Sequence, residues 1–438
     1  MSAPIEIELP TLPDLLALHA TWPARYPYLL QTLAGTGWDI LFACPLRTRR
    51  FRLGETGVLA ALEAAWREEE QPLSASRLPF RGGWFVYLGY EVLQEIEPRV
   101  PARRPPADFP LAVLSRIPAA LLVDRQRQRA YAVAEADHRD CLDPLLADAA
   151  ARPVWHPAPA AAEWIAEVPA ETFLEGVARI LAYIREGDVF QVNLARWWQA
   201  TLAAGVTAAD LYAALSRHNP APFAGLAHFG RETIVSSSPE RLVRVQGEAI
   251  ETRPIAGTRP RAADPAADAL LRAELLATAK ERAEHIMLVD LERNDLGRVC
   301  VPGSIEVPCL LELVSYAHVH HLESTVRGRL RPGVSPAGVV RALFPGGTIT
   351  GCPKVRCLEI IRELEGAPRL AYTGSMGYVN RDGSLDLNIL IRSFIVRDDR
   401  LEFWAGAGIV ADSRPERELA ETLAKARGLL RALGIHHD

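Results

Sequence analysis

The sequence of 438 residues has few cysteines and no long apolar run. Its six cysteines form no CxxC pair and no short disulfide framework, which favours a reducing compartment. No apolar run approaches the roughly 18 residues that a membrane span requires. The N-terminal residues are acidic where a secretory signal peptide would be basic. We therefore expect a cytoplasmic location and no membrane partner.

Basic charge is not in excess either. The formal net charge is −5 at pH 7 and the pI is near 6.2, so nucleic acid is not expected as a partner. Hydrophobic residues make up 49% of the chain and charged residues 24%, as in a globular protein with a large core. A small anionic substrate would therefore depend on positive charge gathered locally at its site.

Two proline-rich stretches, residues 98–110 and 153–169, divide the chain. Proline is excluded from the interiors of helices and central strands, so these stretches are expected to link more regular segments. They separate an N-terminal segment, residues 1–165, from a second region, residues 166–438. Both contain apolar strand-like runs that lack partners of their own, and we expect the two to form one structural unit.

The second region alternates helix signals with strand signals. Thr172 and Glu175 have the spacing of a capping box before an apolar stripe of helical period. Asp264, followed by proline, predicts the start of a longer helix that continues to residue 289. A third helix is expected after Ser413, which has a glutamate three residues later in a second capping box.

Strands and turns complete the prediction of fold class. A strand at residues 188–198 places Gln191 and other polar side chains on one face. Turns at residues 382–383 and 398–399 predict two successive antiparallel hairpins, with the strand after the first turn continuing to Arg392. Strands joined by tight turns, with helices between them, predict an α+β fold with mostly antiparallel sheets.

Two pairs of glutamates at helical spacing form the first candidate site. Glu281 and Glu284 are three residues apart, as are Glu418 and Glu421, so each pair projects from one side of its helix. Carboxylates on two facing helices could bind Mg²⁺ and leave positions for water and a substrate carboxylate. The pairs could equally form solvated helix faces, with Glu421 and Lys425 as an ion pair.

Three further features could bind or act on a small molecule. Glycines cluster at residues 343–354 and 404–410, where backbone amides could approach an anion or the chain could simply turn. Glu240 lies beside an apolar run, an environment that raises a carboxyl pKa and favours proton donation. His321 has histidine neighbours but lacks the cysteine or carboxylate spacing of a zinc site.

Nine short segments follow one another in a distinctive order. They read GDVFQVNLA (187–195), SSSPERL (236–242), RPIAGTRPR (253–261), EHIMLVDLERNDLGRV (284–299), HHLEST (320–325), FPGGTITGCPK (344–354), YTGSMGY (372–378), LNILIRS (387–393) and GAGIVADSRPERELAETLAKA (406–426). In this order they resemble the chorismate-utilising enzymes, which are the anthranilate, aminodeoxychorismate, isochorismate and salicylate synthases. The N-terminal half resembles them through RYPYLLQT (25–32) and LPFRGGWFVYLGYE (78–91). The resemblance implies a large, mostly antiparallel two-sheet β core with helices packed outside.

The resemblance also implies chorismate as substrate and Mg²⁺ as cofactor. The positions of Glu284 and Glu421 match residues that bind magnesium directly in the family. Those of Glu281 and Glu418 match residues that act mostly through water. Glu240 matches the general acid that protonates the departing C4 hydroxyl.

Other positions match residues that contact the substrate or assist the chemistry. The enolpyruvyl carboxylate is expected to bind an arginine, a tyrosine and the backbone at two glycines. The implied substrate-binding residues are Tyr372, Arg392, Gly406, Gly408, Lys425 and Thr348. The implied catalytic positions besides Glu240 are Gln191, His321 and Thr258.

Gln191 and Ala256 bear on which reaction is expected. Members that add water have a lysine base at the position of Gln191, so a glutamine favours ammonia as the nucleophile. QVNLA, NPAPF (219–223) and FPGG are most like aminodeoxychorismate synthase component I, which makes 4-amino-4-deoxychorismate for p-aminobenzoate and folate. Ala256 replaces the PIKGT lysine of that enzyme, so anthranilate synthase component I, which makes anthranilate and pyruvate, is the alternative. A non-catalytic chorismate-binding regulatory subunit is the third hypothesis.

An ammonia source and a regulator remain to be considered. No cysteine lies in the GxCxG pattern of a glutamine amidotransferase, so a separate glutaminase subunit is implied as partner. RYPYLLQT matches the segment that binds tryptophan in feedback-inhibited relatives. Gln31 and Thr32 replace the usual Glu-Ser there, which argues against regulation by tryptophan.

Overall fold

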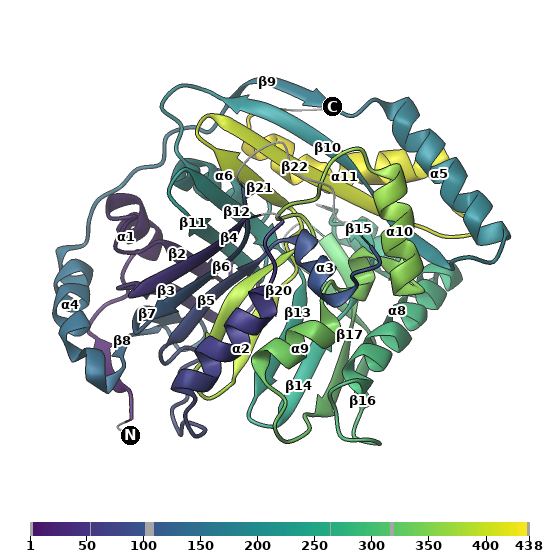
Figure 1. Cartoon of the computed structure of the whole chain (residues 1–438). Helices are drawn as coiled ribbons and strands as arrows, with labels where there is room; N and C mark the ends of the chain where they lie inside the picture. The colour runs from purple at the N-terminus through teal and green to yellow at the C-terminus, as the bar shows by residue number, and fades with distance from the viewer. Residues whose placement is uncertain (1–2, 53, 101–108, 263, 316–318, 436–438) are drawn as a thin grey trace.

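The computed structural model describes residues 3–52, 54–100, 109–262, 264–315 and 319–435. It confirms the α+β class and the two-sheet core (Figure 1). The helices in the described residues are α1 (Leu15–Thr21), α2 (Val58–Glu69), α3 (Leu93–Ile96), α4 (Leu142–Ala151), α5 (Ala170–Arg185), α6 (Ala208–His218), α7 (Pro265–Ala277), α8 (Ala279–Gly297), α9 (Pro336–Leu343), α10 (Lys354–Leu364) and α11 (Pro415–Ala432).

In the described residues, the paired strands of both sheets are antiparallel. The first sheet contains, in spatial order, β1 (Ile5–Leu9), β8 (Arg129–Ala134), β7 (Ala119–Asp124), β3 (Trp38–Ala43), β2 (Tyr28–Gln31), β11 (Phe223–His228), β12 (Glu232–Ser238), β21 (Ser393–Arg397), β22 (Arg400–Ile409), β10 (Gln191–Leu202) and β18 (Gly351–Cys352), with β9 (Ala162–Glu167) also paired to β10. The second contains β15 (Ile255–Pro260), β17 (Val319–Arg329), β14 (Ala249–Arg253), β13 (Arg241–Gln246), β20 (Leu385–Asn388), β19 (Ser375–Asn380), β5 (Gly83–Leu88), β6 (Pro110–Ile117) and β4 (Arg47–Arg52), with β16 (Glu306–Ser315) also paired to β17.

Strands from the two halves of the chain are neighbours in both sheets. In the first sheet β2 pairs with β11, and in the second β5 pairs with β19. The N-terminal strands therefore complete sheets that also carry the C-terminal motifs. The division of the chain at residue 165 itself stays a prediction.

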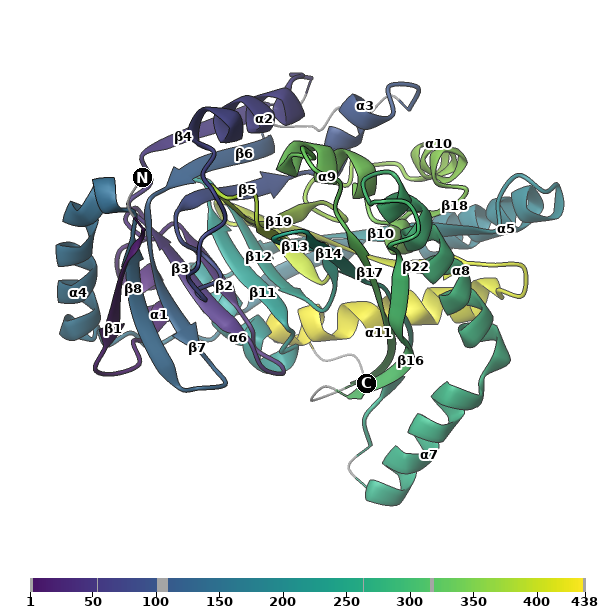
Figure 2. The ribbon, with the colours of Figure 1, turned by 90° about the horizontal axis from the view of Figure 1, so that it is seen from below.

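The two sheets face each other across a shared apolar layer. Tyr28 on β2 and Phe85 on β5 stack with their ring centroids 4.0 Å apart, and Trp404 on β22 belongs to the same buried cluster. Helices cover the outer faces: α6 and α11 pack on the first sheet, and α2 and α9 on the second (Figure 2). With both faces covered, each sheet can bury its apolar residues.

The predicted hairpins are confirmed, and the strand after the first turn is shorter than predicted. The first hairpin joins β19 to β20 with Gly383 in the left-handed region, and the second joins β21 to β22 with Asp398 at φ 54°. However, β20 ends at Asn388, and Arg392 has a φ of 51°. The chain bends at this point because Leu390 leaves the strand to exchange backbone hydrogen bonds with Thr373 and Gly374.

The helix signals were right about where helices occur and partly wrong about their ends. Asp264 caps α7 by accepting a hydrogen bond from the Ala267 amide, as predicted. The single helix expected to continue to residue 289 is broken at Thr278, whose hydroxyl donates to the Glu274 carbonyl 2.7 Å away. Neither predicted capping box forms, because α5 begins at Ala170 and α11 at Pro415 without a side-chain cap.

Candidate active site

Glu240 lies in the crossover between the two sheets, directly after β12 and before β13. Its side chain is buried, and Oε1 accepts a hydrogen bond from the Thr348 hydroxyl at 2.7 Å. The Ile389 amide donates to its carbonyl oxygen at 3.0 Å. Burial raises the pKa of Glu240 to about 8, although the Thr348 hydrogen bond opposes this shift. The carboxyl is therefore mostly protonated at neutral pH, as a general acid requires.

Three basic side chains lie in the same region. Burial lowers the pKa of Arg392 to about 10, and the charge of nearby Glu240 opposes that change. Burial also lowers the pKa of His321 to about 3, and the positive charges of Arg392 and Lys425 add to the effect. His321 Nδ1 lies 3.4 Å from the Gly257 carbonyl oxygen. The site thus has a neutral imidazole beside two cations suited to a substrate carboxylate.

Gln191 is placed by β10 against Gly408 of β22. Its Nε2 donates to Glu284 Oε1 at 2.7 Å, which joins the first sheet to α8. A Cβ atom at Gly408 would collide with this amide nitrogen and would meet the Glu284 carboxylate. The Gln191 carbonyl oxygen Oε1 is buried without a hydrogen-bond partner. Gly408 is therefore required for the amide to reach the carboxylate, and one polar atom is left for another partner.

Gly406 forms a second close approach on the same strand. A Cβ there would meet the Tyr372 hydroxyl and Asn193 Oδ1, which is itself buried without a partner. Lys425 Nζ donates to the Gly406 carbonyl at 3.0 Å, and so α11 is tied to β22. The Tyr372 ring stacks on Trp404 with centroids 6.1 Å apart. Polar groups from β10, α11 and the loop before β19 thus converge on β22 here.

The four glutamates fit the donor chemistry of Mg²⁺ but are engaged with protein groups. Glu281 pairs with Arg259 at 2.7 Å and Glu421 with Lys425 at 2.7 Å. Burial raises the pKa of Glu281, and the nearby negative charge of Glu421 adds to this. Glu281 Oε2 is buried without a hydrogen-bond partner, as a hard oxygen ligand would be before it binds a cation. Within the ranges described, no three acidic, histidine or cysteine side chains are already grouped as a metal site.

The structure brings most of the predicted residues together. Thr258 lies on β15 opposite His321, but its side chain is outside the described part of the structure. Glu418 is buried on α11, one turn before Glu421. The alternative of a purely solvated helix face does not describe Glu418, which is 5% exposed.

Sequence reasoning did not single out Glu292. It lies inside the 284–299 motif, is buried, and accepts a hydrogen bond from the Gly347 amide at 3.2 Å. Burial raises its pKa to about 7, and its charge in turn raises the pKa of Glu240. An acidic side chain inside an apolar helical stretch was the available signal for this residue.

Comparison with known proteins identifies the family. The family model for chorismate binding enzymes matches residues 27–431, and the chain belongs to that family. An anthranilate synthase component I-like protein of Synechocystis sp. is 43% identical over 81% of this chain and 73% of its own length. Aminodeoxychorismate synthase component 1 of Klebsiella aerogenes is 36% identical over 99% of this chain and 100% of its own length.

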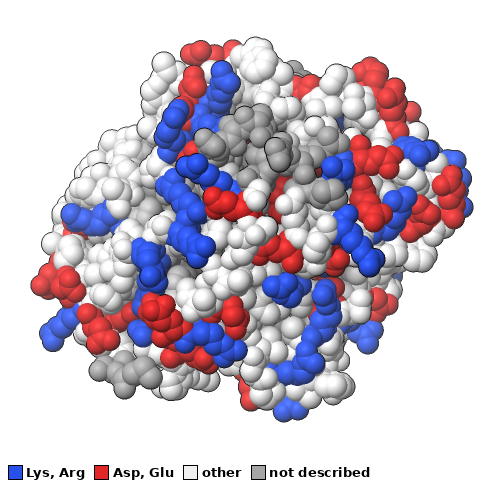
Figure 3. All heavy atoms as spheres, viewed as in Figure 1, with Lys and Arg blue, Asp and Glu red and all other residues white. Residues whose placement is uncertain are grey.

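A solved structure has the same architecture. Anthranilate synthase component I from Streptococcus pneumoniae TIGR4 superposes with a TM-score of 0.79 at 29% identity, covering 89% of this chain and 91% of that one. This chain is thus a chorismate-utilising enzyme. None of the helices in the described ranges is long and apolar enough to cross a bilayer. Figure 3 shows basic and acidic side chains interspersed over one face of the molecule.

Proposed function

We propose that this chain is the chorismate-aminating component of an aminodeoxychorismate synthase, making 4-amino-4-deoxychorismate from chorismate and ammonia. The observation that carries the choice of amination is the neutral Gln191 side chain, held by Glu284 against Gly408. In the family resemblance, enzymes that add water have a basic lysine at this position. The end-to-end match with the Klebsiella enzyme supports amination at C4.

Glu240 is the proposed proton donor to the departing C4 hydroxyl. Its raised pKa of about 8 keeps the proton on the carboxyl at neutral pH, and Thr348 orients it. His321 stays neutral near the ring because its pKa is about 3. Both groups are thus uncharged at neutral pH while Glu240 donates its proton during C–O cleavage.

Arg392 and Lys425 supply the positive charge that a dicarboxylate substrate needs. Arg392 would bind the enolpyruvyl carboxylate, with the Tyr372 hydroxyl and the backbone at Gly406 and Gly408 completing the site. The absence of a Cβ at both glycines lets polar side-chain atoms of Gln191, Asn193 and Tyr372 approach β22 closely, where they can also reach a bound substrate.

Magnesium is the proposed cofactor. Glu284 and Glu421 would bind it directly, and Glu281 and Glu418 through water. Bound there, the ion would supply Lewis-acid stabilisation of charge on the substrate. Glu281 also pairs with Arg259, and Glu421 with Lys425, so these carboxylates are held by basic groups from β15 and α11.

Ammonia is proposed to come from a separate glutaminase subunit. No cysteine of this chain has the GxCxG nucleophile pattern. The Klebsiella and Streptococcus pneumoniae relatives are both called component I or 1 of their synthases, which supports a second component here. A cytoplasmic location goes with this proposal.

Anthranilate formation is the second candidate, and Ala256 favours it. The alanine lies on β15, paired with Leu322 of β17, where the resemblance places a nucleophilic lysine in many aminodeoxychorismate synthases. Relatives from Streptomyces coelicolor and Thermus thermophilus that are 41% identical to this chain are called anthranilate synthase component 1. Direct attack of ammonia at C2 would give this outcome.

Product analysis distinguishes the two reactions. The purified chain is incubated with chorismate, Mg²⁺ and ammonium salt near pH 8, with and without aminodeoxychorismate lyase. We expect p-aminobenzoate only when the lyase is present. Fluorescent anthranilate with pyruvate, formed without lyase, would assign the second reaction. Parallel reactions with EDTA should lose turnover and regain it on addition of excess Mg²⁺.

A further inference from the structure

Arg369, in the loop between α10 and β19, is a buried arginine at the centre of a hydrogen-bond network behind the proposed site. Only 1% of the residue is exposed. Its guanidinium donates to the backbone carbonyl oxygens of Asn193 at 2.9 Å and Ile349 at 3.0 Å, and to the Thr373 hydroxyl at 3.3 Å. One side chain therefore joins β10, the segment just before β18 and its own loop.

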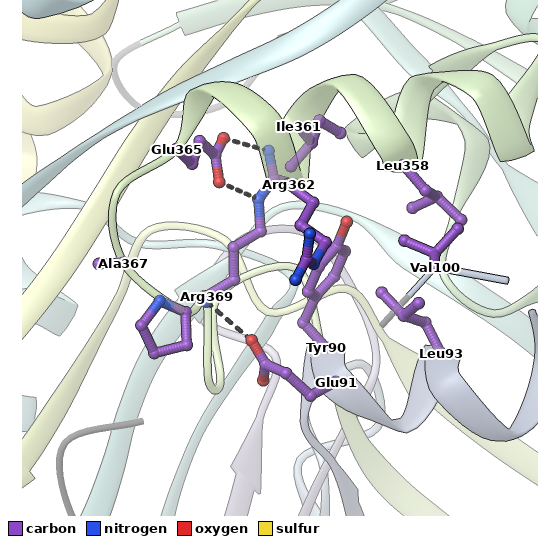
Figure 4. Close-up of a pocket in the computed structure, with 11 residues that line it drawn as sticks. Tyr90, Glu91, Leu93, Val100, Leu358, Ile361, Arg362, Glu365, Ala367 and Arg369 are labelled. Atoms are coloured by element: carbon purple, nitrogen blue, oxygen red, sulfur yellow. Dashed lines mark hydrogen bonds and ion pairs between the residues drawn. The ribbon is translucent and has the colours of Figure 1, made fainter. Parts of the chain in front are cut away.

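Two carboxylates fix the position of Arg369. Glu365 accepts from its Nε at 2.8 Å and from Nη2 at 2.6 Å, a bidentate pair seen in Figure 4. Glu365 also accepts from the Ala195 amide of β10 at 2.9 Å. Glu91, from the 78–91 motif, accepts from the Arg369 amide at 2.9 Å. Glu365 thus holds the guanidinium in one orientation, and Glu91 from the N-terminal half of the chain holds the Arg369 backbone.

Each segment that Arg369 contacts carries a residue of the proposed site. Asn193 is two residues from Gln191 on the same face of β10, and Ile349 follows Thr348 directly. Thr373 follows Tyr372, whose ring lies 5.4 Å from the guanidinium carbon and whose amide donates to the Arg369 carbonyl at 2.9 Å. Arg369 itself contacts none of the groups assigned to the proton donor or the metal.

We propose that Arg369, with Glu365 as its partner, is a positioning residue that sets the mutual geometry of Gln191, Thr348 and Tyr372. This inference rests on the proposed function of the site. The reacting groups come from three separate segments, so an error of about 1 Å in any one would cost about 100-fold in rate. The arginine guanidinium is planar and has five N–H donors, so it can hold all three segments at once. A lysine ammonium lacks this fixed planar arrangement of donors.

Arg369 and Glu365 also line a small hollow beside Tyr90 and Leu358 (Figure 4). The replacements below are close in size to the original side chains, so the variants are expected to fold. Replacing both charged partners together avoids leaving an unpaired buried charge.

The test compares Arg369→Lys with the double variant Arg369→Met/Glu365→Leu. Chorismate consumption gives kcat and KM, chorismate binding is followed by tryptophan fluorescence, and melting is measured on the same samples. We expect kcat to fall about 10- to 100-fold in both variants, with a smaller loss of chorismate affinity because Thr348 and Tyr372 also contact the substrate. The matched control is Arg116→Lys on β6, a buried arginine that also has a bidentate carboxylate partner, Glu135, and that contacts none of the three site segments.

Each result decides between positioning and a structural role. Unchanged kcat in Arg369→Lys with native melting would overturn the inference, even if the double variant fails to fold. Equal losses in Arg116→Lys and Arg369→Lys would also overturn it. The wild-type chain in the same assay tests the proposed function separately, because the product that it makes from chorismate decides that function whatever the variants do.

Discussion

Glu240 places a protonated carboxyl near the Arg392 guanidinium. Burial raises its pKa to about 8 even though the Thr348 hydroxyl hydrogen bond opposes the change. Arg392 stays charged beside it, because its pKa is lowered only to about 10. An acid and an anion-binding cation can thus operate together near pH 7.

Glu240→Gln should lower kcat by about 100-fold or more, because the amide cannot give up a proton to the leaving hydroxyl. In the wild-type chain, kcat should fall as pH rises through about 8, where the Glu240 carboxyl ionises. Steady-state chorismate consumption from pH 6 to 9.5 measures both effects. The control is Glu248→Gln, at an exposed turn between β13 and β14. Turnover of Glu240→Gln within threefold of wild type would exclude a general-acid role.

The same carboxyl should make folding stability depend on pH. Its pKa is raised from 4.5 to about 8 in the folded chain. Its stabilising contribution is therefore complete below pH 4.5 and is lost as pH rises to about 8. Relative to wild type, the melting temperature of Glu240→Gln should increase from pH 5 to pH 9, as measured by calorimetry. A difference in melting temperature that is the same at both pH values would contradict the buried titration.

At the scale of single elements, the sequence predicted turns and one helix cap correctly but placed the starts of two helices wrongly. The left-handed turns at Gly383 and Asp398 follow from residues that tolerate this conformation, and Asp264 caps its helix through its own neighbours. The predicted capping boxes do not form because α5 starts at Ala170, before Thr172, and α11 starts at Pro415, one residue too late for Ser413 to be its N-cap. A capping pattern in the sequence therefore does not fix the first residue of a helix.

In the site, too, several residues within sequence motifs were predicted, and those whose roles depend on tertiary contacts were not. Motif order placed Glu240 and Gln191 in one candidate site because each belongs to a segment that resembles the family. Arg369 and Glu292 were not predicted, since their roles depend on burial and on partners more than 50 residues away in the sequence. The left-handed backbone at Arg392 likewise depends on hydrogen bonds made by a neighbouring loop.

Strand β22 provides an element-scale prediction. Gly406→Ala should weaken chorismate binding at least about tenfold, because the new Cβ would collide with Asn193 Oδ1 and the Tyr372 hydroxyl. Fluorescence titration with chorismate measures the loss, and circular dichroism checks the fold. Gly297→Ala is the matched control, since its Cβ would meet only Ile305 at 3.8 Å. Wild-type affinity in Gly406→Ala would place the substrate away from β22.

For the whole molecule, shared sheets predict cooperative unfolding. Strands before and after residue 165 pair in both sheets, at β2 with β11 and at β5 with β19. Neither half can bury its apolar faces alone, so calorimetry should give one transition with equal calorimetric and van't Hoff enthalpies. Separately expressed residues 1–165 and 166–438 should each be insoluble or unfolded. Two resolved transitions, or a folded isolated half, would contradict this expectation.

The interleaved strands also impose an order on biosynthesis. Arg81, just before β5, donates through its amide to Asn380 Oδ1, 299 residues later in the chain. While the ribosome makes that interval, the early strands wait with unpaired edges and exposed apolar faces. At about 5–20 residues per second, the delay lasts on the order of tens of seconds. A nascent chain of this design should therefore depend on chaperones that bind it before its second half emerges.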